Sequence, residues 1–303
     1  MNIQNFEIGK ERALMVAELS ANHNQKFELA VETIKAAQAS GADAIKLQTY
    51  TADTLTIDCE NEYFRIKHGT LWDGKTLYQL YQDAYTPWEW QPKLKAYAES
   101  LGLICFSTPF DRTAVDFLAQ MDVPCYKVAS FEINDLPLIE YIAAQGKPVM
   151  LSTGIATLAD IEAAVHACRR QGNNQLVLLK CTSAYPAPLA EANLRMLPNL
   201  SETFQTMVGL SDHTLGSSAA IAAVALGAKV IEKHFILDRN LGGPDAAFSM
   251  EPAEFKQMVQ AIRDVELALG SVNYELSDQV RQKGKKAIRD VKRGTPLDWT
   301  MIA

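Results

Sequence analysis

Short apolar segments rich in β-branched residues alternate along the chain with longer amphipathic segments rich in alanine. The apolar segments have the length of buried strands, and the segments between them repeat apolar residues at helical spacing. Several helical segments end in glycine, which favours the left-handed conformation at a helix C-terminus. The eight predicted strands are residues 13–19, 44–50, 103–109, 125–130, 148–154, 176–183, 206–213 and 230–235.

This alternation predicts an α/β fold of the (β/α)8 TIM-barrel class. Parallel strands need crossover connections, and the crossovers in this chain are predicted to be helical. Most units are spaced about 20–30 residues apart, as eight strand–helix units of one barrel require. A doubly wound sheet is the alternative, but it usually has fewer strands and a glycine fingerprint. No G-x-G-x-x-G or Walker motif occurs in the sequence.

The barrel is predicted to span residues 1–270 and to carry one long insertion. Residues 51–86 separate the second predicted strand from the next helix. Such an insertion would lie at the C-terminal ends of the strands and form part of a pocket wall. After Gly270 the sequence becomes polar and basic, and we expect residues 271–303 to be a linker with a short tail, too small for a further domain.

Composition and charge narrow the possible classes of function. The 303 residues are 48% apolar, enough for a large core. A net charge of -7 argues against a nucleic-acid partner, so any bound anion must meet a local cationic pocket. Without a signal peptide or a membrane-spanning run, the protein is expected to be cytoplasmic. Five cysteines form no C-x-x-C pair and are interpreted as reduced thiols: Cys59, Cys105, Cys125, Cys168 and Cys181.

Polar side chains collect at the C-terminal ends of the predicted strands, where barrel enzymes place their sites. In chain order they are Glu18, Lys46, Gln48, Ser107, Thr108, Lys127, Ser130, Glu132, Ser152, Thr153, Lys180, Thr182, Ser183, Tyr185, Ser211, Asp212, His213, Glu232, Lys233 and His234. Only every second side chain of a strand points into a barrel. Lys46 therefore shares a face with Gln48, and Ser211 shares one with His213.

Two histidines in this set suggest a metal site. His213 and His234 end adjacent strands, and barrel closure brings Glu18 beside them, a set that fits a divalent cation with open coordination positions. Taken singly, a histidine at a strand end is more often a hydrogen-bonded structural residue, and only the pair favours a metal. Lys46 and Lys127 would be costly to bury unpaired, which favours a bound anion or a carboxylate partner.

Other polar residues have ordinary structural explanations. The serines taken singly are typical of loops and helix caps, and only their common location favours ligand contact. His23, His68 and His166 are interpreted as structural. Asp245 belongs to the turn sequence GGPD and could also face a ligand.

With these residues in view, the chain resembles the sialic acid synthase family, enzymes that condense phosphoenolpyruvate with an amino sugar to make nonulosonic acids. The resemblance covers roughly residues 10–270. Its motifs are AELSANHN, IKLQTYTADT, FSTPFD, YKVASFEINDLPLI, LSTGIAT, LKCTSAYPAP, GLSDHTLG and IEKHFILDRNLGGPDAAFSMEP. The segments SFEINDLPLIEY and LWDGKTLYQLYQDAYTPWEW are most similar to the branch that makes pseudaminic acid.

The resemblance implies a role for each matching residue. A manganese or magnesium ion would be bound by His213 and His234, with Glu18 as a base or positioning group for water. Phosphoenolpyruvate would be held by Lys46, Lys127, Ser130, Ser152, Ser183 and Ser211. The sugar, 2,4-diacetamido-2,4,6-trideoxy-altrose in the pseudaminic acid branch, would face Gln48, Thr108, Glu132, Tyr185 and Asp245.

Two departures from the family pattern are visible. Gln25 stands where family members usually have glycine. Family members also carry an antifreeze-protein-like C-terminal cap that covers the partner's site in a homodimer, and residues 271–303 resemble only its beginning. The homodimer would be weakened without the cap. The alternatives are the same reaction on N-acetylmannosamine or on the legionaminic acid precursor, or a capless barrel that binds ligand without turnover.

Overall fold

The computed structural model describes residues 1–303 except residues 11, 68–71, 276–289, 291, 295 and 297–303. Compact packing divides the chain into two units, Met1–Ala268 and Leu269–Ala303. The expectation of a linker and a truncated cap in residues 271–303 falls largely outside the described residues, as does His68. Within the ranges described, no helix combines the length and the apolarity that crossing a bilayer requires.

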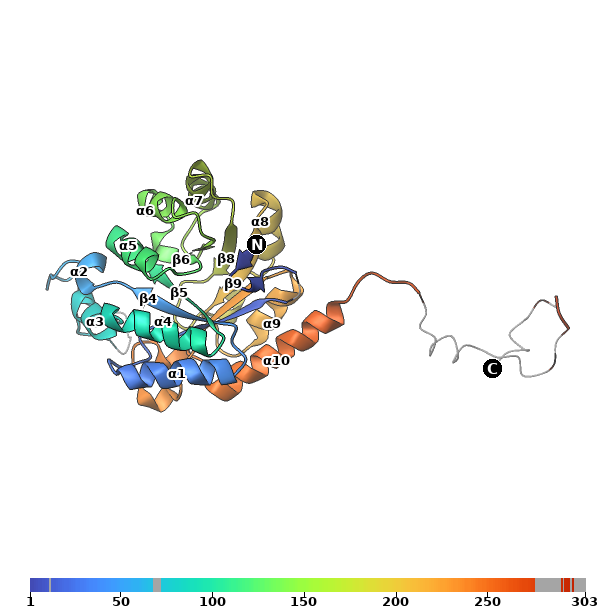
Figure 1. Cartoon of the computed structure of the whole chain (residues 1–303), viewed down its shortest axis with the longest axis horizontal. Helices are drawn as coiled ribbons and strands as arrows, with labels where there is room; N and C mark the ends of the chain where they lie inside the picture. Colours follow the sequence, from blue (N-terminus) through green and yellow to red (C-terminus); the bar gives the residue numbers. More distant parts are fainter. Residues whose placement is uncertain (11, 68–71, 276–289, 291, 295, 297–303) are drawn as a thin grey trace. The chain divides into compact units, whose positions relative to one another are not determined.

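The first unit is a closed barrel of eight parallel strands, which confirms the predicted fold (Figure 1). Its strands are β3 (Leu14–Glu18), β4 (Ala44–Thr49), β5 (Ile104–Pro109), β6 (Tyr126–Val128), β7 (Val149–Ser152), β8 (Leu176–Cys181), β9 (Met207–Asp212) and β10 (Val230–His234). Closure is made by β10, which pairs with β3 on one side and β9 on the other. All eight predicted strand segments therefore contain a strand of the barrel.

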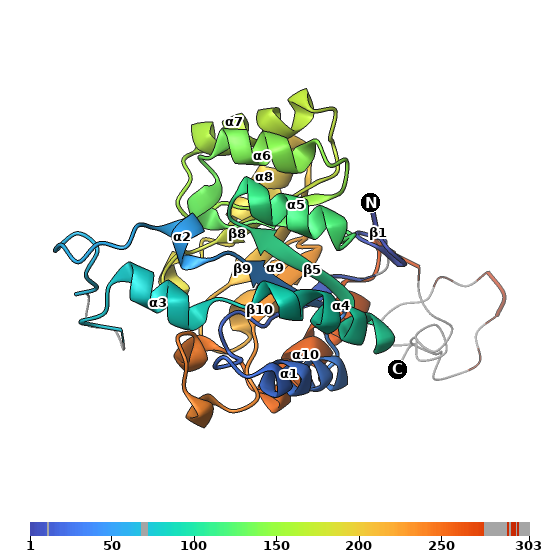
Figure 2. The same ribbon diagram turned by 60° about the vertical axis from the view of Figure 1, so that its left-hand side comes forward.

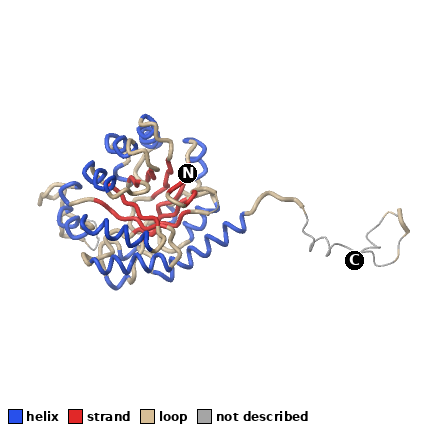
Figure 3. Tube along the Cα trace, in the orientation of Figure 1, coloured by secondary structure: helices blue, strands red, loops and turns tan. Residues whose placement is uncertain are grey.

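Helices surround the strands, as the blue and red traces of Figure 3 show. The main helix after each strand is, in order, α1 (Phe27–Ala39), α4 (Gln91–Ser100), α5 (Arg112–Gln120), α6 (Leu136–Ala143), α7 (Leu158–Arg170), α8 (Met196–Phe204), α9 (Ser218–Ala225) and α10 (Pro252–Leu269). Several begin at a side-chain cap: Asp111 accepts hydrogen bonds from the first turn of α5, and Thr157 forms a capping box with Asp160.

Short elements complete the unit. The insertion after β4 contains α2 (Ala52–Leu55) and α3 (Leu77–Ala84). Single turns of 3₁₀ helix are η1 (Trp88–Trp90), η2 (Ser130–Glu132), η3 (Leu189–Glu191), η4 (Arg239–Leu241) and η5 (Ala246–Phe248). An antiparallel hairpin of β1 (Asn2–Ile3) and β2 (Phe6–Glu7), which the sequence analysis did not predict, precedes the barrel.

The core has two layers because successive strand residues point to opposite faces. Outward residues such as Ile45 and Leu178 pack under the helices, whereas inward residues such as Val16 and Phe106 fill the barrel. Ile3 from the hairpin joins the inner layer and closes the N-terminal end. Figure 2 shows α2 and α3 at the end of the barrel opposite β1. The remaining inward positions, at the C-terminal strand ends, are therefore free to form a site.

Candidate active site

Charged side chains at the C-terminal strand ends form a buried network in the barrel mouth. Lys46 Nζ lies 2.7 Å from Glu18 Oε2 and 3.6 Å from Glu232 Oε1, and it donates a 3.3 Å hydrogen bond to Thr108 Oγ1. Lys127 Nζ lies 3.5 Å from Glu232 Oε1. Strand parity therefore brings the two predicted anion-binding lysines to one carboxylate, Glu232.

Glu232 was among the polar strand-end residues of the sequence but was given no role, although it shares the inward face of β10 with His234. Ser211 donates a 2.9 Å hydrogen bond to its Oε1. Burial alone would raise the pKa of Glu232, but the charges of Lys127 and Lys46 lower it to about 2. Glu232 is thus the ionised partner that allows both lysines to be buried.

Glu18 has the opposite electrostatic environment. Burial raises its pKa to about 7, and the charge of Glu232 adds to this rise, while Lys46 opposes it. Its Oε1 accepts a 2.9 Å hydrogen bond from Gln48 Nε2. A carboxyl group with a pKa near neutrality can take up and release protons at physiological pH.

A cluster of serine hydroxyls lies beside Lys127. The backbone N–H of Gly154 donates a 3.1 Å hydrogen bond to Ser130 Oγ, and a Cβ at residue 154 would overlap the hydroxyls of Ser130 and Ser183. Ser152 Oγ and Ser183 Oγ are buried and have no hydrogen-bond partner. Buried hydroxyls are usually paired, so these two are oriented for a ligand that accepts hydrogen bonds.

The two predicted metal ligands lie together. The ring centroids of His213 and His234 are 5.3 Å apart. His213 Nδ1 lies 3.1 Å from the carbonyl oxygen of Thr182, which can only accept, so Nδ1 carries the proton and Nε2 keeps its lone pair. Burial lowers the pKa of His234 well below its ordinary value, and its Nδ1 makes no hydrogen bond.

These imidazoles fit a divalent cation. Both rings expose a nitrogen lone pair, and His234 Nδ1 lies 3.6 Å from Asp245 Oδ2. Among the residues that the structure describes, no group of three or more His, Cys, Asp or Glu side chains is placed to hold a metal ion. The protein would therefore supply two imidazoles and leave the other coordination positions to water and substrate.

The predicted sugar-facing residues border the same mouth. Gln48 also donates to Ser20 Oγ at 3.2 Å, and Ser20 donates to Asp245. Tyr185 is 44% exposed, and its ring centroid lies 4.4 Å from that of His213. Burial raises the pKa of Glu132 to about 7. Thr108 accepts the hydrogen bond from Lys46 described above. The fourteen residues that were given roles from the sequence thus all lie at the C-terminal strand ends or in the loops that follow them.

Some of the polar strand-end residues that were expected at the barrel mouth point away from it. Lys180 points away from the barrel interior and donates to the Cys181 carbonyl at 2.6 Å and to Thr182 at 3.2 Å. Asp212 and Lys233 also lie on the outward face, where they pair with each other at 2.7 Å. The reason is the alternation of side chains along each strand, which leaves every second residue outside the mouth.

Cys181 was interpreted only as a reduced thiol with no role in the site, but it lies on the inward face of β8. Its Sγ is 3.7 Å from His213 Nδ1. Burial would raise the pKa of this thiol, whereas the hydrogen bond with His213 lowers it to about 7. The parity that selects Ser183 on the same strand would also have selected Cys181.

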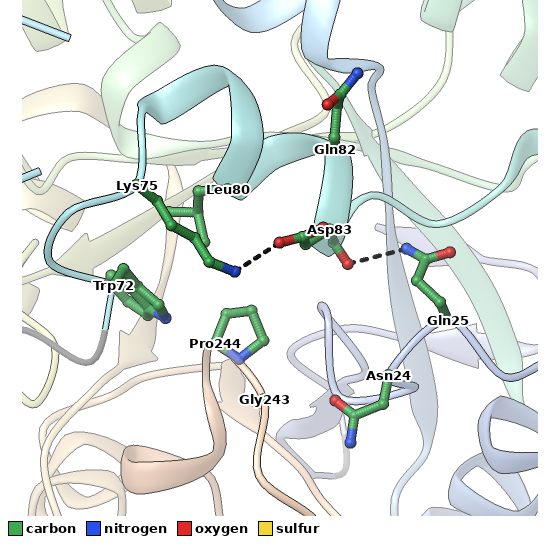
Figure 4. A pocket seen from close by; sticks show the side chains of 9 residues that line it. All are labelled: Asn24, Gln25, Trp72, Lys75, Leu80, Gln82, Asp83, Gly243 and Pro244. Atoms are coloured by element: carbon green, nitrogen blue, oxygen red, sulfur yellow. Dashed lines mark hydrogen bonds and ion pairs between the residues drawn. The ribbon is translucent and has the colours of Figure 1, made fainter. Parts of the chain in front are cut away.

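The insertion after β4 lines a cavity of about 520 Å³ beside the loop that carries Asp245 (Figure 4). Lys75 pairs with Asp83 at 2.6 Å on one wall, and Gly243 and Pro244 form another part of it. This confirms the prediction that residues 51–86 form part of a pocket wall.

Gln25 links the same insertion to the loop after β3. Its φ of +54° is one that glycine adopts without strain, which fits the glycine that family members usually have at this position. The side chain donates to the carbonyl oxygens of Asp83 at 3.1 Å and Tyr85 at 2.5 Å. These bonds offset the backbone strain of the left-handed conformation.

The two described histidines that were interpreted as structural lie outside the mouth. His23 is fully buried, accepts a 3.1 Å hydrogen bond at Nδ1 from the N–H of Gln25, and therefore donates from Nε2 to Thr86 Oγ1 at 3.0 Å. His166 is exposed on α7. Neither contacts the network in the mouth through any hydrogen bond recorded for the described residues.

Comparison with known proteins shows the family to which the chain belongs. The model of the NeuB family matches residues 33–274. Pseudaminic acid synthase of Campylobacter jejuni is 45% identical over 299 residues, which cover 97% of this chain and 87% of the relative. Pseudaminic acid synthase of Helicobacter pylori is 47% identical over 289 residues, covering 93% and 85%.

Among solved structures, the N-acetylneuraminic acid synthetase of Leptospira borgpetersenii in complex with citrate is 30% identical. It superposes with a TM-score of 0.83 over 93% of this chain and 94% of that one. The family resemblance expected from the motifs is confirmed, and the chain belongs to the NeuB family.

Proposed function

We propose that the protein is a pseudaminic acid synthase. It condenses phosphoenolpyruvate with 2,4-diacetamido-2,4,6-trideoxy-altrose and water, and it releases pseudaminic acid and phosphate. One observation carries the proposal: in a chain 45% identical to such a synthase, unpartnered hydroxyls and buried lysines lie in the same mouth as two adjacent imidazoles.

The anionic substrate would occupy the cluster of serines and lysines. Lys46, Lys127 and Ser211 now share Glu232, and an incoming phosphate or carboxylate offers them further charge-assisted hydrogen bonds. Ser130, Ser152 and Ser183 supply hydroxyl donors around Gly154. Fixing phosphoenolpyruvate against the sugar lowers the entropic part of the barrier.

The reaction requires one carbon–carbon bond to form and one carbon–oxygen bond to break. C3 of phosphoenolpyruvate bonds to the aldehyde carbon of the open-chain sugar, and the aldehyde oxygen takes up a proton. Water adds to C2 and loses a proton, for which Glu18, with its pKa near 7, is the proposed acceptor. The resulting tetrahedral intermediate then expels phosphate to leave a carbonyl group at C2.

A divalent cation, manganese or magnesium, would be held by His213 and His234. When bound it would act as a Lewis acid that polarises the aldehyde group. The chain's own contribution is to orient the rings: the Thr182 carbonyl accepts from His213 Nδ1, which leaves Nε2 to bind the cation, and burial keeps His234 uncharged. Neutral ligands leave the cation its full charge.

The sugar would lie across the opposite side of the mouth. Gln48 donates to both Glu18 and Ser20, and Ser20 donates to Asp245, so Gln48 and Asp245 are held in place before the sugar arrives. Thr108, Glu132 and Tyr185 are the other proposed contacts. The expected homodimer stays a prediction, which sedimentation of the purified chain checks.

Phosphate release with three candidate sugars tests the proposal. The protein is incubated with phosphoenolpyruvate, manganese and one of three sugars: the altrose derivative, N-acetylmannosamine or the legionaminic acid precursor. The product is identified by its mass in mass spectrometry. The altrose derivative should give the fastest release, with one phosphate per pseudaminic acid. Faster release with another sugar would reassign the substrate, and no release with any would reject the enzyme in favour of ligand binding without turnover.

A further inference from the structure

A buried ion pair lies directly behind the two histidines. Lys233 Nζ is 2.7 Å from Asp212 Oδ2, and each side chain is 1% exposed. The two residues are paired across β9 and β10. Because side chains alternate along a strand, they occupy the outward face, while His213 and His234 follow them on the inward face.

The pair fixes the backbone on the far side of His213. Asp212 Oδ1 accepts a 2.9 Å hydrogen bond from the N–H of Thr214. Lys233 Nζ also donates to the carbonyl oxygens of Thr214 at 2.5 Å and Gly216 at 2.8 Å. All three ammonium protons are therefore used, and the turn after β9 is tied to β10 at residues 212, 214 and 216.

The His213 main chain is held from a second direction. Its carbonyl oxygen accepts a 2.9 Å hydrogen bond from the N–H of Ala187, in the loop after β8. The imidazole Nδ1 contacts Thr182 in the same loop. With the ion pair on the β10 side, the position of His213 relative to His234 is set by contacts from both neighbouring strands.

Stability alone is a weak explanation for this pair. The outward neighbours Leu210 and Ile231 belong to the apolar layer under the helices. Desolvation of two buried charges commonly cancels their attraction, so a pair of apolar side chains of similar volume would serve the core as well. Its geometry instead sets the register and the turn that carry both imidazoles.

We infer that Asp212 and Lys233 are a positioning pair, which holds His213 and His234 at the separation that a divalent cation needs. This inference rests on the metal site of the proposed function. Neither residue would touch substrate or cation, so each would act through the histidine that follows it in the chain. Groups of this kind behind metal ligands typically change metal affinity by about 10- to 100-fold.

Manganese titration of the purified protein, followed by electron paramagnetic resonance without substrates, tests the inference. The double variant Asp212→Asn/Lys233→Met removes both charges while keeping similar side-chain volumes. It should remain folded by circular dichroism but bind manganese about 10- to 100-fold more weakly than the wild type. In the condensation assay its kcat should fall by a larger factor than its KM for phosphoenolpyruvate rises.

A second variant and a control keep the test decisive. Asp212→Glu retains the charges but displaces the carboxylate by one methylene, so it should fold and also bind manganese more weakly. The control Asp43→Asn/Arg263→Met removes a 2.9 Å ion pair at the other end of the barrel. It should lower the melting temperature and leave manganese affinity unchanged.

The outcomes separate this inference from the proposed function. Wild-type affinity in folded Asp212→Glu, and in the double variant where it folds, would overturn the positioning role alone. If the wild type itself bound no manganese, the metal site and the inference would both fail. A loss of melting temperature with unchanged affinity would reduce the pair to a structural contact and likewise overturn the inference.

Discussion

Lys46 Nζ lies 2.7 Å from Glu18 Oε2, and the two side chains are only 5% and 1% exposed. Lys46 also approaches Glu232, so one ammonium group faces two carboxylates of different acidity. The lysines hold the pKa of Glu232 at about 2, while burial leaves that of Glu18 at about 7. The barrel mouth therefore contains one permanent anion and one group able to exchange protons.

Acid should inactivate the enzyme through Glu18. A base with a pKa near 7 is half protonated at about pH 7, and its ionised fraction falls about tenfold for each pH unit below that value. We expect kcat/KM to fall with this slope between pH 7 and pH 5. Glu18→Gln should lose about 10²- to 10⁴-fold in kcat and lack this limb of the pH profile. A wild-type profile that is flat down to pH 5 would contradict the role of Glu18.

A methyl group at Gly154 should damage the anion site. Gly154→Ala places a Cβ against the hydroxyls of Ser130 and Ser183, so KM for phosphoenolpyruvate should rise about tenfold, equivalent to about 1.4 kcal/mol. Gly146→Ala is the matched control. Its Cβ would meet nothing within 4 Å, but its φ of +73° adds backbone strain. The control should lower stability without changing KM. An unchanged KM in Gly154→Ala, together with a raised KM in Gly146→Ala, would argue against an anion site at Gly154.

Removal of either imidazole should abolish catalysis and preserve the fold. His213→Ala and His234→Ala should each reduce phosphate release to background, with unchanged circular dichroism spectra. His166→Ala, on the exposed face of α7, should behave as the wild type. Dialysis against a chelator should mimic the two active-site variants, and manganese should restore the rate. Full activity after dialysis would speak against a metal-dependent reaction.

His23 should make the protein less stable in acid. Burial lowers its pKa from 6.5 to about 4 in the folded state. Between these pH values the unfolded chain binds a proton that the folded chain does not, so stability is lost as the pH falls from 6.5 to 4. The loss is on the order of 3 kcal/mol.

Urea unfolding at pH 7.5, 6.5, 5.5 and 4.5 measures this contribution as a difference between the wild type and His23→Gln. Other groups titrate in the same range, including Glu132, whose raised pKa acts in the opposite direction. The difference between the wild type and the variant cancels the contributions of these other groups. An unchanged difference across the pH range would show that His23 is not held neutral by burial.

The strand ends were predictable because two regularities act together. Closure of a parallel barrel gathers the C-terminal ends, and a period of two selects Lys46 with Gln48 and Ser211 with His213. The same rule, applied throughout, would have excluded Lys233 and included Cys181. Sequence alone assigns these residues poorly where a strand passes into a turn, since parity depends on where the strand ends.

Other features had no signal in the sequence. The β1–β2 hairpin has two residues in each strand, too few for a periodic pattern, and its place in the inner core depends on tertiary packing of Ile3. Ser20 connects Gln48 to Asp245 only because the loop after β3 turns back over the mouth. The contact of Ser20 with Asp245 joins residues 225 positions apart, which local patterns cannot reveal.

A crystal of the protein soaked with manganese and phosphoenolpyruvate tests the central claim, that the anion and metal sites share one barrel mouth. The account predicts an anomalous manganese peak at the imidazoles of His213 and His234, and phosphoenolpyruvate contacting Lys46 and Lys127. Manganese bound elsewhere, or phosphoenolpyruvate bound away from both lysines, would contradict it.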